Sequence, residues 1–531
     1  MLVPKIRMSI PISQDDVSPQ GVIPCTDPAT NESLGSIPID GPDAVHAAVD
    51  RARTAHLQWK KTSLKERARV LRLLLNYTVQ HKDDICRAVQ RDSGKTRENA
   101  LVGEIWPACE KFRWMIKNGP KHLNPEKMSS GLLVHKRARL EFHPLGVVAA
   151  IIPWNYPFQN VANPIIPALM AGNAVVLKPS EWVSWSSRQF IDGFRQVLSD
   201  AGYDPNLIQG VYGYGETGAA LARAAVDTIL FIGSVSNGRK VLEASAERIV
   251  PVVMELGGKD AFVVCDDADL EQAVHASLAG CFINAGQNCV AAERLLVHKD
   301  VYDAFEMRVG ELVQAFRQGP GRDELADIGA IVTPVQLDLI QQAVDRALSQ
   351  GARLVTGGKR VLSELGNYYQ PTILADVTPD MDIANEEIFG PIMLLIRTEN
   401  DAHAITVANG VPYGLGSSVF SKDHARAQQI AQSLDAGMTA INDFGGITYM
   451  AQDLTFGGVK ASGFGRMNGR DGLRSMCNVK AVMDDRFPIH KPNIIFPVKE
   501  RDYGTFSGVI DLIYSNTWKD RLNALKRLLG L

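Results

Sequence analysis

The sequence predicts an α/β protein that contains more than one domain. Its 531 residues are too many for one ordinary hydrophobic core, and 45% of them are hydrophobic, which is enough to fill two. From about residue 145 onward, short apolar runs bounded by glycine, proline or asparagine alternate with amphipathic segments. This alternation is typical of buried parallel strands that are connected by helices.

The N-terminal part of the chain is predicted to be helical, and a nucleotide-binding βαβ region is predicted to follow it. After a polar N-terminal arm, apolar residues recur at three- and four-residue intervals in 43–59 and 64–90, which indicates amphipathic helices. From Gly146 the pattern changes to strands separated by helices, an order typical of βαβ nucleotide-binding domains. The predicted strands are 147–152, 174–177, 208–211 and 228–232, and the helices are 190–200, 218–225 and 238–246.

A second alternation follows and predicts a second α/β domain. Its strands are expected at 261–264, 294–297, 353–356, 372–375 and 392–397, and its helices at 270–281, 302–318 and 336–350.

Composition excludes several classes of function. The formal net charge is −3 and acidic and basic residues are mixed, so the chain has no basic surface signal for nucleic acid. The seven cysteines are scattered without Cys-x-x-Cys spacing, which is typical of reduced thiols in a cytosol-like compartment. Pro4 and Pro11 interrupt the N-terminal apolar segment, and no run approaches the ~18 apolar residues of a membrane span. We therefore expect a cytoplasmic protein that binds no nucleic acid.

Two segments carry a recognisable chemistry. Glu255 lies in Met254–Lys259, and Cys289 ends the segment Gly286–Cys289. A thiolate can add to an aldehyde carbonyl, and a nearby carboxylate can deprotonate the water that later releases the product. A single cysteine is more often a small buried hydrophobic residue, so the interpretation depends on the surrounding motifs.

These two segments resemble, nearly letter for letter, signatures of the aldehyde dehydrogenase superfamily. Five further motifs extend the resemblance over about residues 20 to 485; each short motif alone can occur by chance, but seven in this order are not expected to. They are Pro153–Pro157, Leu177–Glu181, Phe231–Ser234, Glu386–Pro391 and Phe456–Gly463. The segment 442–450 departs from the common pattern and resembles a divergent plant and fungal branch.

The resemblance implies a domain organisation. It places a Rossmann-like NAD-binding domain at 1–125 and 145–257, and an α/β catalytic domain at 258–474. A small β oligomerisation arm is expected at 126–144 and 475–485, centred on 132–143 and 478–483. A C-terminal extension with an amphipathic helix would occupy 486–531. The implied assembly is a homodimer or a dimer of dimers.

The resemblance also implies a reaction, the NAD-dependent oxidation of an aldehyde to a carboxylic acid. Cys289 would form a thiohemiacetal and then a thioester, while the Asn155 side chain stabilises the oxyanion. Glu255 would be the general base for hydrolysis, with freedom to move beside Gly257 and Gly258. Lys178 would assist catalysis and bind the cofactor. No metal is required, because no cluster of ligands has metal-binding spacing.

The cofactor is expected to be NAD, because Glu181 would repel the 2′-phosphate of NADP; NADP is the less favoured alternative. Glu386 is interpreted as a solvated neighbour of Glu387. Gly213–Gly218 matches Gly-x-Gly-x-x-Gly, but it follows several strands and contains an acid, so Gly233 and Ser234 are preferred at the pyrophosphate. The implied cofactor residues are Ile152, Pro153, Trp154, Lys178, Ser180, Glu181, Gly215, Gly233, Ser234, Leu256, Glu387 and Phe389.

The substrate is expected to be a small-molecule aldehyde. By alignment with the Asn-Tyr-Pro motif, its pocket would include Trp106, Tyr156, Asn163, Tyr449 and Met450. Many relatives that oxidise small aliphatic aldehydes have an aromatic residue in place of Asn163, so this pocket is expected to be wider or more polar.

The extension ends in a segment, 518–529, whose apolar residues fall on one helical face with basic residues around it. One interpretation is a peripheral membrane helix. The other is that this face packs on the protein's own body or on a sister subunit.

Two other classes of function fit the sequence less well than aldehyde oxidation. A coenzyme A acylating dehydrogenase generally lacks the carboxylate at the position of Glu255, so its presence argues against that class. A non-catalytic protein on an old dehydrogenase scaffold would be expected to have lost Cys289 or Glu255, and both are present.

Overall fold

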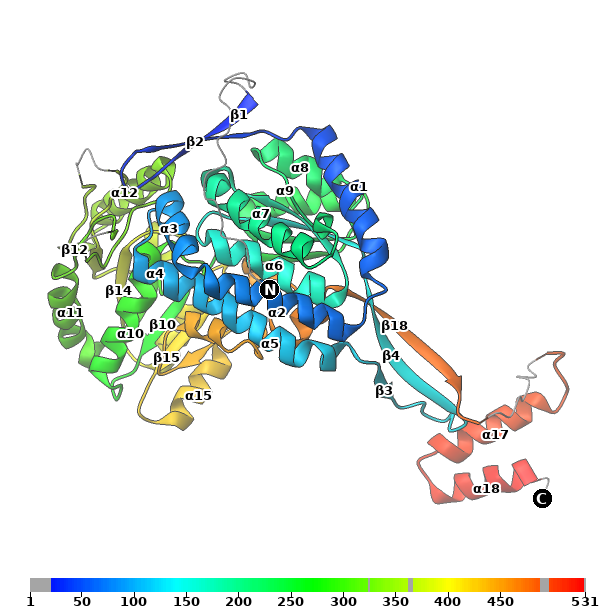
Figure 1. Cartoon of the computed structure of the whole chain (residues 1–531). Coiled ribbons are helices and arrows are strands. Elements are labelled where there is room, and N and C mark those ends of the chain that lie inside the picture. The colour runs from blue at the N-terminus through cyan, green and yellow to red at the C-terminus, as the bar shows by residue number, and fades with distance from the viewer. Residues whose placement is uncertain (1–20, 323–324, 362–365, 488–495, 530–531) are drawn as a thin grey trace. The chain divides into compact units, whose positions relative to one another are not determined.

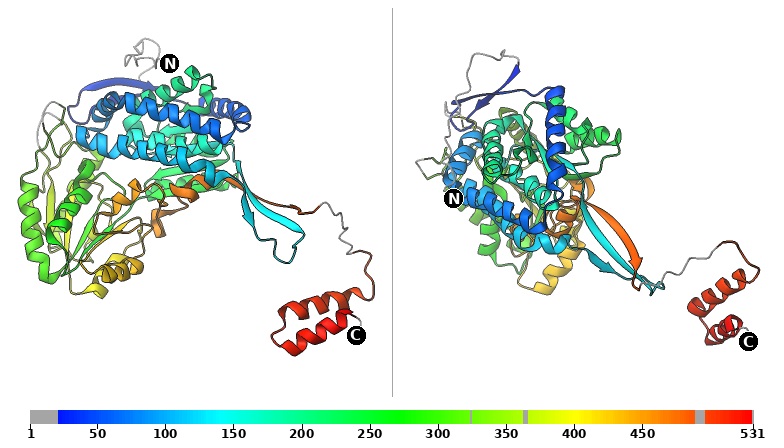
Figure 2. Two further views of the ribbon diagram at one scale, coloured as in Figure 1. Left: turned by 60° about the horizontal axis from the view of Figure 1, so that its bottom comes forward. Right: turned by 45° about the vertical axis from the view of Figure 1, so that its right-hand side comes forward.

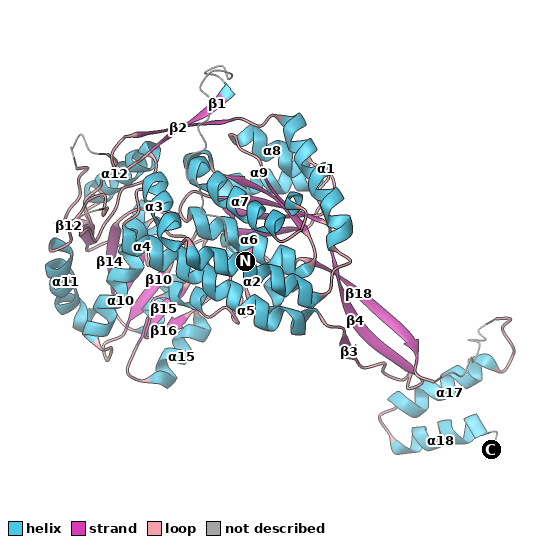
Figure 3. Cartoon of the chain, viewed as in Figure 1, coloured by secondary structure: helices cyan, strands magenta, loops and turns pink. Residues whose placement is uncertain are grey.

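A computed structural model describes residues 21–322, 325–361, 366–487 and 496–529 (Figure 1). The chain divides into two compact units. The first is formed by Met1–Glu126 and Leu140–Lys480, and the second by Lys127–Arg139 and Ala481–Leu531. The first unit contains two largely parallel sheets with helices packed on them, which confirms the predicted α/β fold class (Figure 3).

The six-stranded sheet of the first unit has the order β17-β9-β8-β5-β6-β7. Five strands are parallel, and only β17 runs antiparallel to its neighbour β9. The chain builds this sheet outward from β5 in both directions, so that β5 and β8 are neighbours where the strand order reverses. The strands are β5 (Val147–Ile152), β6 (Ala174–Pro179), β7 (Ile208–Gly210), β8 (Thr228–Gly233), β9 (Val252–Leu256) and β17 (Gly463–Phe464).

Helices connect these strands and pack on the sheet, as the βαβ pattern predicted. They are α6 (Pro157–Ala171), α7 (Ser184–Asp200), α8 (Gly215–Arg223) and α9 (Val235–Ala246). The three predicted helices begin earlier than the apolar periodicity indicated, at Ser184, Gly215 and Val235, and α6 was not predicted.

The N-terminal helices pack beside this sheet, with one difference from the prediction. The single helix expected at 64–90 is two helices that meet at His81, where acidic Asp83 and Asp84 begin the second. A two-stranded sheet, β1 (Val22–Thr26) and β2 (Ser33–Pro38), also replaces part of the polar arm. The helices are α1 (Pro42–Trp59), α2 (Leu64–Gln80), α3 (Lys82–Ser93), α4 (Arg97–Ala100), the π-helix Leu101–Ile105 and α5 (Trp106–Leu123).

The seven-stranded sheet has the order β12-β13-β14-β11-β10-β15-β16, with β12 antiparallel to β13 and the other pairs parallel. The five predicted strands are present; β15 and β16 were not predicted. The strands are β10 (Ala261–Val264), β11 (Arg294–His298), β12 (Arg353–Thr356), β13 (Thr372–Ala375), β14 (Ile392–Thr398), β15 (Ser417–Phe420) and β16 (Ala440–Ile441). The helices are α10 (Leu270–Phe282), α11 (Lys299–Gln314), α12 (Pro334–Ser349), α13 (Asp382–Asn385), α14 (Asp401–Asn409) and α15 (His424–Ser433). A short helix near the C-terminal end of the first unit, α16 (Gly469–Arg474), packs instead on α5 and α6.

A three-stranded sheet of order β18-β4-β3 occupies the region expected to form the arm. Its strands are β3 (Glu126–Met128), β4 (Lys136–Pro144) and β18 (Cys477–Asp485). β4 begins four residues later than the predicted segment 132–143, whereas β18 is longer than the predicted 478–483. The domain boundaries themselves stay a prediction.

In the second unit, α17 (Asp502–Tyr514) and α18 (Trp518–Leu529) form a helical hairpin (Figure 2). The sequence predicted α18 but not α17. Gly508 permits their close packing, because a Cβ there would lie 3.0 Å from Leu528. None of the helices in the described part of the chain combines the length and apolar character needed to span a bilayer.

Candidate active site

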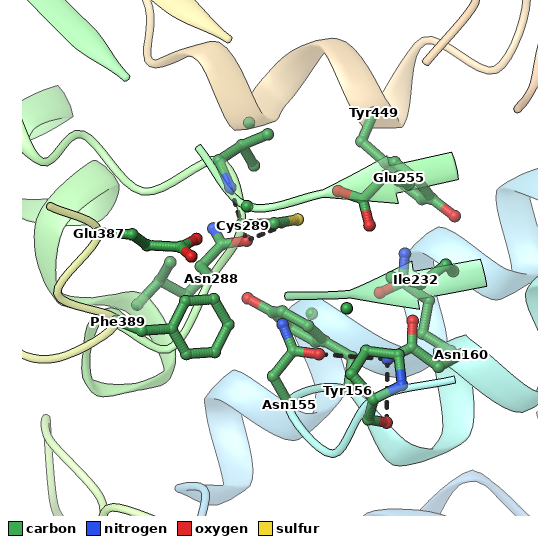
Figure 4. Close-up of a pocket in the computed structure, with 18 of the residues that line it drawn as sticks. Asn155, Tyr156, Asn160, Ile232, Glu255, Asn288, Cys289, Glu387, Phe389 and Tyr449 are labelled. Carbon is green, nitrogen blue, oxygen red and sulfur yellow. Dashed lines mark hydrogen bonds between the residues drawn. The ribbon is translucent and has the colours of Figure 1, made fainter. Parts of the chain in front are cut away.

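A cavity of about 700 Å³ opens at the carboxyl ends of the central strands of the six-stranded sheet (Figure 4). Its lining includes residues that directly follow β5, residues that end β8, and Glu255 of β9. Doubly wound sheets bind ligands where the strand order reverses, and here that point lies between β5 and β8. The loop that carries Cys289 contributes another part of the wall.

The loop before Cys289 is held in an unusual backbone conformation. Asn284 and Ala285 both have φ of 54°, and Gly286 follows with φ of 71°. A Cβ on Gly286 would lie 2.0 Å from the carbonyl oxygen of Gly390, so only glycine permits this approach. Gly258 meets the same loop, since a Cβ there would lie 2.6 Å from the carbonyl oxygen of Cys289. These contacts fix the position of the thiol.

The Cys289 sulfur points toward the carboxylate of Glu255 (Figure 4). Burial raises the pKa of Glu255 to about 7, although interaction with the thiol opposes the rise. Burial, and then the charge of Glu255, raises the pKa of Cys289 well above its ordinary value. The two groups therefore disfavour simultaneous ionisation and titrate as a pair. Glu255 Oε1 is buried without a hydrogen-bond partner among the described residues.

The backbone of Glu255 is more constrained than the nearby glycines, Gly257 and Gly258, suggested. Its backbone pairs with Ile232 of β8 on one side and with Gly463 of β17 on the other. The carboxylate can therefore change position through its side-chain torsions, while the main chain stays in the sheet.

Asn155 directly follows β5 and lines the cavity with Cys289. Its side-chain amide donates to the Gln287 carbonyl at 3.3 Å and accepts from Asn160 at 3.2 Å. These contacts orient the NH2 group toward the Cys289 loop.

Three buried residues that the sequence did not single out support Asn155. Lys95 Nζ donates to the Asn155 carbonyl oxygen at 2.8 Å and forms an ion pair with Glu104 at 2.7 Å. Glu104 also accepts from the Gln159 amide, and Asn284 donates to the Asn155 carbonyl at 2.9 Å. Lys95 and Asn284 are far from Asn155 in the sequence, and no periodic pattern relates them, so these contacts were visible only in the structure.

The end of β8 has the geometry that was predicted for it. The strand ends at Gly233, and the Ser234 hydroxyl caps α9 by accepting from the Asn237 amide at 3.3 Å. A Cβ on Gly238 would lie 2.8 Å from Leu256, so this glycine lets α9 approach β9. Unpaired amides at the start of such a helix are suited to a pyrophosphate. Gly233, Ser234 and Leu256 all line the cavity.

Glu387 and Phe389 also line the cavity. Their segment is held by Glu293, another residue that the sequence did not single out. Glu293 accepts from the backbone amides of Ile388 and Phe389, both at 3.0 Å, while its charge is paired with Lys259 at 2.6 Å. Phe389 has φ of 55° and packs edge-on against Trp154, with ring centroids 5.4 Å apart. Burial, and then the charge of Glu293, raises the pKa of Glu387 to about 8.

Other predicted cofactor residues lie along the same sheet edge and do not line the cavity. Lys178 and Ser180 stand at the end of β6, where Lys178 pairs in register with Ile151 of β5. Glu181 accepts from Ser180 at 3.1 Å and lies 3.6 Å from Lys178 Nζ. Burial lowers the pKa of Lys178. The predicted residues outside the cavity are Ile152, Lys178, Ser180, Glu181 and Gly215.

The Gly-x-Gly-x-x-Gly segment lies beside the edge strand. It follows β7, and Gly215 begins α8, with Glu216 in the first turn of the helix. A Cβ on Gly218 would lie 4.0 Å from Lys178. The helix α8 therefore lies next to Lys178 at the end of β6, and not at the crevice between β5 and β8.

All five residues predicted for the substrate pocket line the cavity: Trp106, Tyr156, Asn163, Tyr449 and Met450. Glu386 lines it as well, with its side chain 63% exposed and paired with Arg346 at 2.8 Å.

Among the described residues no group of His, Cys, Asp or Glu side chains has the arrangement of a metal site.

Comparison with known proteins accounts for this arrangement. A sequence model of the aldehyde dehydrogenase family matches residues 16–482. The chain belongs to the aldehyde dehydrogenase family. An aldehyde dehydrogenase-like protein of Saccharomyces cerevisiae is 37% identical over 95% of this chain and 82% of its own length. The succinate-semialdehyde dehydrogenase [NADP(+)] of Escherichia coli is 35% identical over 86% of this chain and 93% of its own length.

Solved structures of the family have the same fold. An aldehyde dehydrogenase of Mycobacterium tuberculosis, complexed with NAD+, superposes with a TM-score of 0.83 and 32% identity, over 88% of this chain and 95% of that one. The chain is thus an aldehyde dehydrogenase, an oxidoreductase of aldehydes that uses NAD or NADP, and oligomers are typical of the family.

Proposed function

We propose that this aldehyde dehydrogenase converts an aldehyde to a free carboxylic acid with Cys289 as nucleophile and Glu255 as general base. The observation that carries the proposal is the meeting of these two side chains with Asn155 in one cavity. The retained carboxylate favours transfer of the acyl group to water over transfer to coenzyme A.

Cys289, Asn155 and Glu255 each act in a different step of the proposed reaction. The Cys289 thiol loses its proton to solvent, and the sulfur then adds to the aldehyde carbon. The Asn155 amide donates to the oxygen that becomes negative in this step. A hydride leaves the carbon and gives a thioester on Cys289. The Glu255 carboxylate then removes a proton from water; the water oxygen attacks the thioester, and the acid leaves as the sulfur is released.

The nicotinamide cofactor supplies the hydride acceptor when it is bound. Glu387 and Phe389 would hold its nicotinamide end, and Gly233 with Ser234 would meet the pyrophosphate. The lysine and acid at the end of β6 would contact the adenine-side ribose, where the carboxylate of Glu181 disfavours a 2′-phosphate. We therefore propose a preference for NAD over NADP. Lys178, Ile152, Pro153, Trp154, Ser180, Gly215 and Leu256 would complete the site.

Turnover assays test this proposal. Purified full-length protein should reduce NAD with members of a panel of short, long, aromatic and amino aldehydes, and NAD should give a higher kcat/KM than NADP. The measurement is absorbance of the reduced cofactor, with and without coenzyme A, followed by chromatography of the product. A free acid is expected under both conditions. A product that forms only with coenzyme A would contradict the role of Glu255.

We also propose that the chain forms a homodimer or a dimer of dimers through the arm strands β4 and β18, and that it is cytoplasmic. All seven cysteines are free, which agrees with a reducing compartment.

We propose a peripheral membrane contact for the α17–α18 hairpin. Large apolar side chains remain exposed on both helices: Tyr503, Phe506, Ile510, Tyr514, Trp518, Leu522, Leu525 and Leu529. Basic residues outnumber the single acid on α18, which suits an anionic headgroup layer: Lys519, Arg521, Lys526 and Arg527 against Asp520.

Sedimentation with liposomes tests this contact. The full chain is expected to sediment with phosphatidylserine vesicles and not with vesicles of phosphatidylcholine alone. A chain that lacks residues 500–531 should stay in the supernatant with both, at unchanged aldehyde turnover. Equal sedimentation of the two proteins would refute the membrane contact and favour packing of the hairpin on protein.

A further inference from the structure

A buried lysine behind the cavity wall sets the orientation of an asparagine. Lys111 of α5 is only 3% exposed, and its Nζ donates to Asn163 Oδ1 and, at 2.7 Å, to Asn468 Oδ1. Among the described residues it has no acidic partner, so these amide oxygens are what compensates the buried amine. Because the oxygen of Asn468 faces Lys111, its NH2 group must point the other way.

The hydroxyl of Tyr449 lies beside this NH2 group. Both groups are buried, and in the described part of the chain neither has a hydrogen bond of good geometry. Burial raises the pKa of Tyr449, while interaction with the side chains of Gln159 and Asn468 opposes the rise, as donors that face the phenolic oxygen would. When the Asn468 NH2 group donates to that oxygen, the hydroxyl proton is left free for a different acceptor.

Glu255 presents a suitable acceptor for that proton. Its Oε1 is buried and has no hydrogen-bond partner among the residues that the structure describes. Tyr449 and Glu255 lie side by side at the cavity wall, and the charges of Cys289 and Glu255 add to the effect of burial on the pKa of Tyr449 (Figure 4). Two neighbouring buried polar groups that lack partners gain free energy when they pair.

We propose that Tyr449 donates a hydrogen bond to Glu255 Oε1, and that Lys111 acts through Asn468 to keep the hydroxyl in this orientation. The inference rests on the proposed function and assigns Tyr449, Asn468 and Lys111 as positioning residues for its general base. The hydrogen bond stabilises the ionised carboxylate. It holds one carboxylate oxygen and leaves the other free to accept the proton of water.

Several ionisable groups surround Glu255. Cys289 interacts with its carboxylate, and the charge of Glu255 adds to burial in raising the pKa of Asp260 and of Glu387. Burial lowers the pKa of Lys111 to about 7. The neutral amine still has two hydrogens for the two amide oxygens, so the orientation of Asn468 persists when Lys111 loses its proton. A substitution at Tyr449 leaves all of these groups in place.

Tyr449→Phe removes the hydroxyl alone and tests the hydrogen bond. Loss of this donor should raise the pKa of Glu255, so the inflection in the pH profile of the steady-state rate should lie about one pH unit above that of the wild type. The burst of reduced cofactor, which precedes the action of the base, should show no such shift. Tyr369→Phe is the matched control, because the Tyr369 hydroxyl is also buried without a partner in the described structure and lies outside the cavity. Its profile should coincide with the wild type.

Lys111→Met tests the action through Asn468. It should move the inflection in the same direction as Tyr449→Phe, whereas Lys117→Met, at an exposed position on the same helix, should not move it. The variant that combines Lys111→Met with Tyr449→Phe should shift no further than Tyr449→Phe alone. Additive shifts would indicate a direct effect of the lysine charge on Glu255 and would overturn the role of Lys111.

Infrared spectroscopy measures the same titration without turnover. The carbonyl stretch of the protonated Glu255 carboxyl, identified by its loss in Glu255→Gln, gives the pKa directly, and this pKa should be higher in Tyr449→Phe. That shift in a protein that oxidises no aldehyde would refute the proposed function and leave the hydrogen bond standing. Aldehyde oxidation with coincident titrations of the wild type and Tyr449→Phe would overturn the hydrogen bond alone.

Discussion

Replacing Cys289 with alanine is expected to abolish aldehyde oxidation, by on the order of 10⁵-fold or more. The substitution removes the sulfur that holds the aldehyde, and no other thiol lines the cavity in the described structure. Reduced cofactor should not appear even in a single turnover, which stopped-flow absorbance would measure. Binding of NAD, followed by calorimetry, should persist because the cofactor residues are untouched.

Cys109→Ala is the matched control. Cys109 is the other half-exposed cysteine, lies on α5 outside the cavity, and has a pKa that burial raises to about 11. Its loss should leave turnover unchanged. If the alanine at 289 kept wild-type turnover, or if Cys109→Ala were the inactive variant, the assignment of the nucleophile would be wrong.

Replacing Glu255 with glutamine is expected to stop the reaction after one step. The carboxamide cannot deprotonate water, so the thioester should accumulate. We expect a rapid burst of reduced cofactor, limited to about one equivalent of enzyme, and then a steady state slower by roughly 10²- to 10⁴-fold. Stopped-flow absorbance resolves the burst, and mass spectrometry of the quenched protein should show the acyl adduct. Glu386→Gln, an exposed acid nearby, should turn over normally.

The pH profile gives an independent measure of the same role. Because burial raises the pKa of Glu255 to about 7, the carboxyl is mostly protonated below that pH and cannot serve as a base. The steady-state rate should therefore increase as pH rises through about 7 and then level off. The inflection should be absent from the glutamine variant. An inflection that persists in that variant would assign it to another group.

The central strands of the six-stranded sheet could be predicted from the sequence because their apolar runs and the turn residues at their ends are clear. The strands β5, β6 and β8 are apolar runs bounded by glycine, proline or asparagine, and the motif residues follow their carboxyl ends. The confirmed fold class depends on these runs. β15 was missed because two serines begin it and leave only Val419 and Phe420 as an apolar run, and β17 was missed because it has only two residues.

The residues that support the site could not be predicted from local pattern. The pair Lys95–Glu104 and the pair Lys259–Glu293 each join residues that share no helical or strand period with the motifs. Lys111 and Asn468 are separated by most of the chain, and only the folded structure brings them together. The break between α2 and α3 was likewise missed, since both helices have the same apolar periodicity.

The contact between Gly286 and Gly390 has a consequence for any attempt to redesign this enzyme. The backbone of Gly286 touches the backbone of Gly390, so the segment that carries Cys289 is in direct contact with the segment that carries Glu387 and Phe389. No side chain at this contact could be shortened to make room. A larger residue at position 286 would therefore displace both segments together. The wall built from α5 and α6 has no part in that contact, so substrate preference can be engineered there at positions other than Asn160, which holds Asn155.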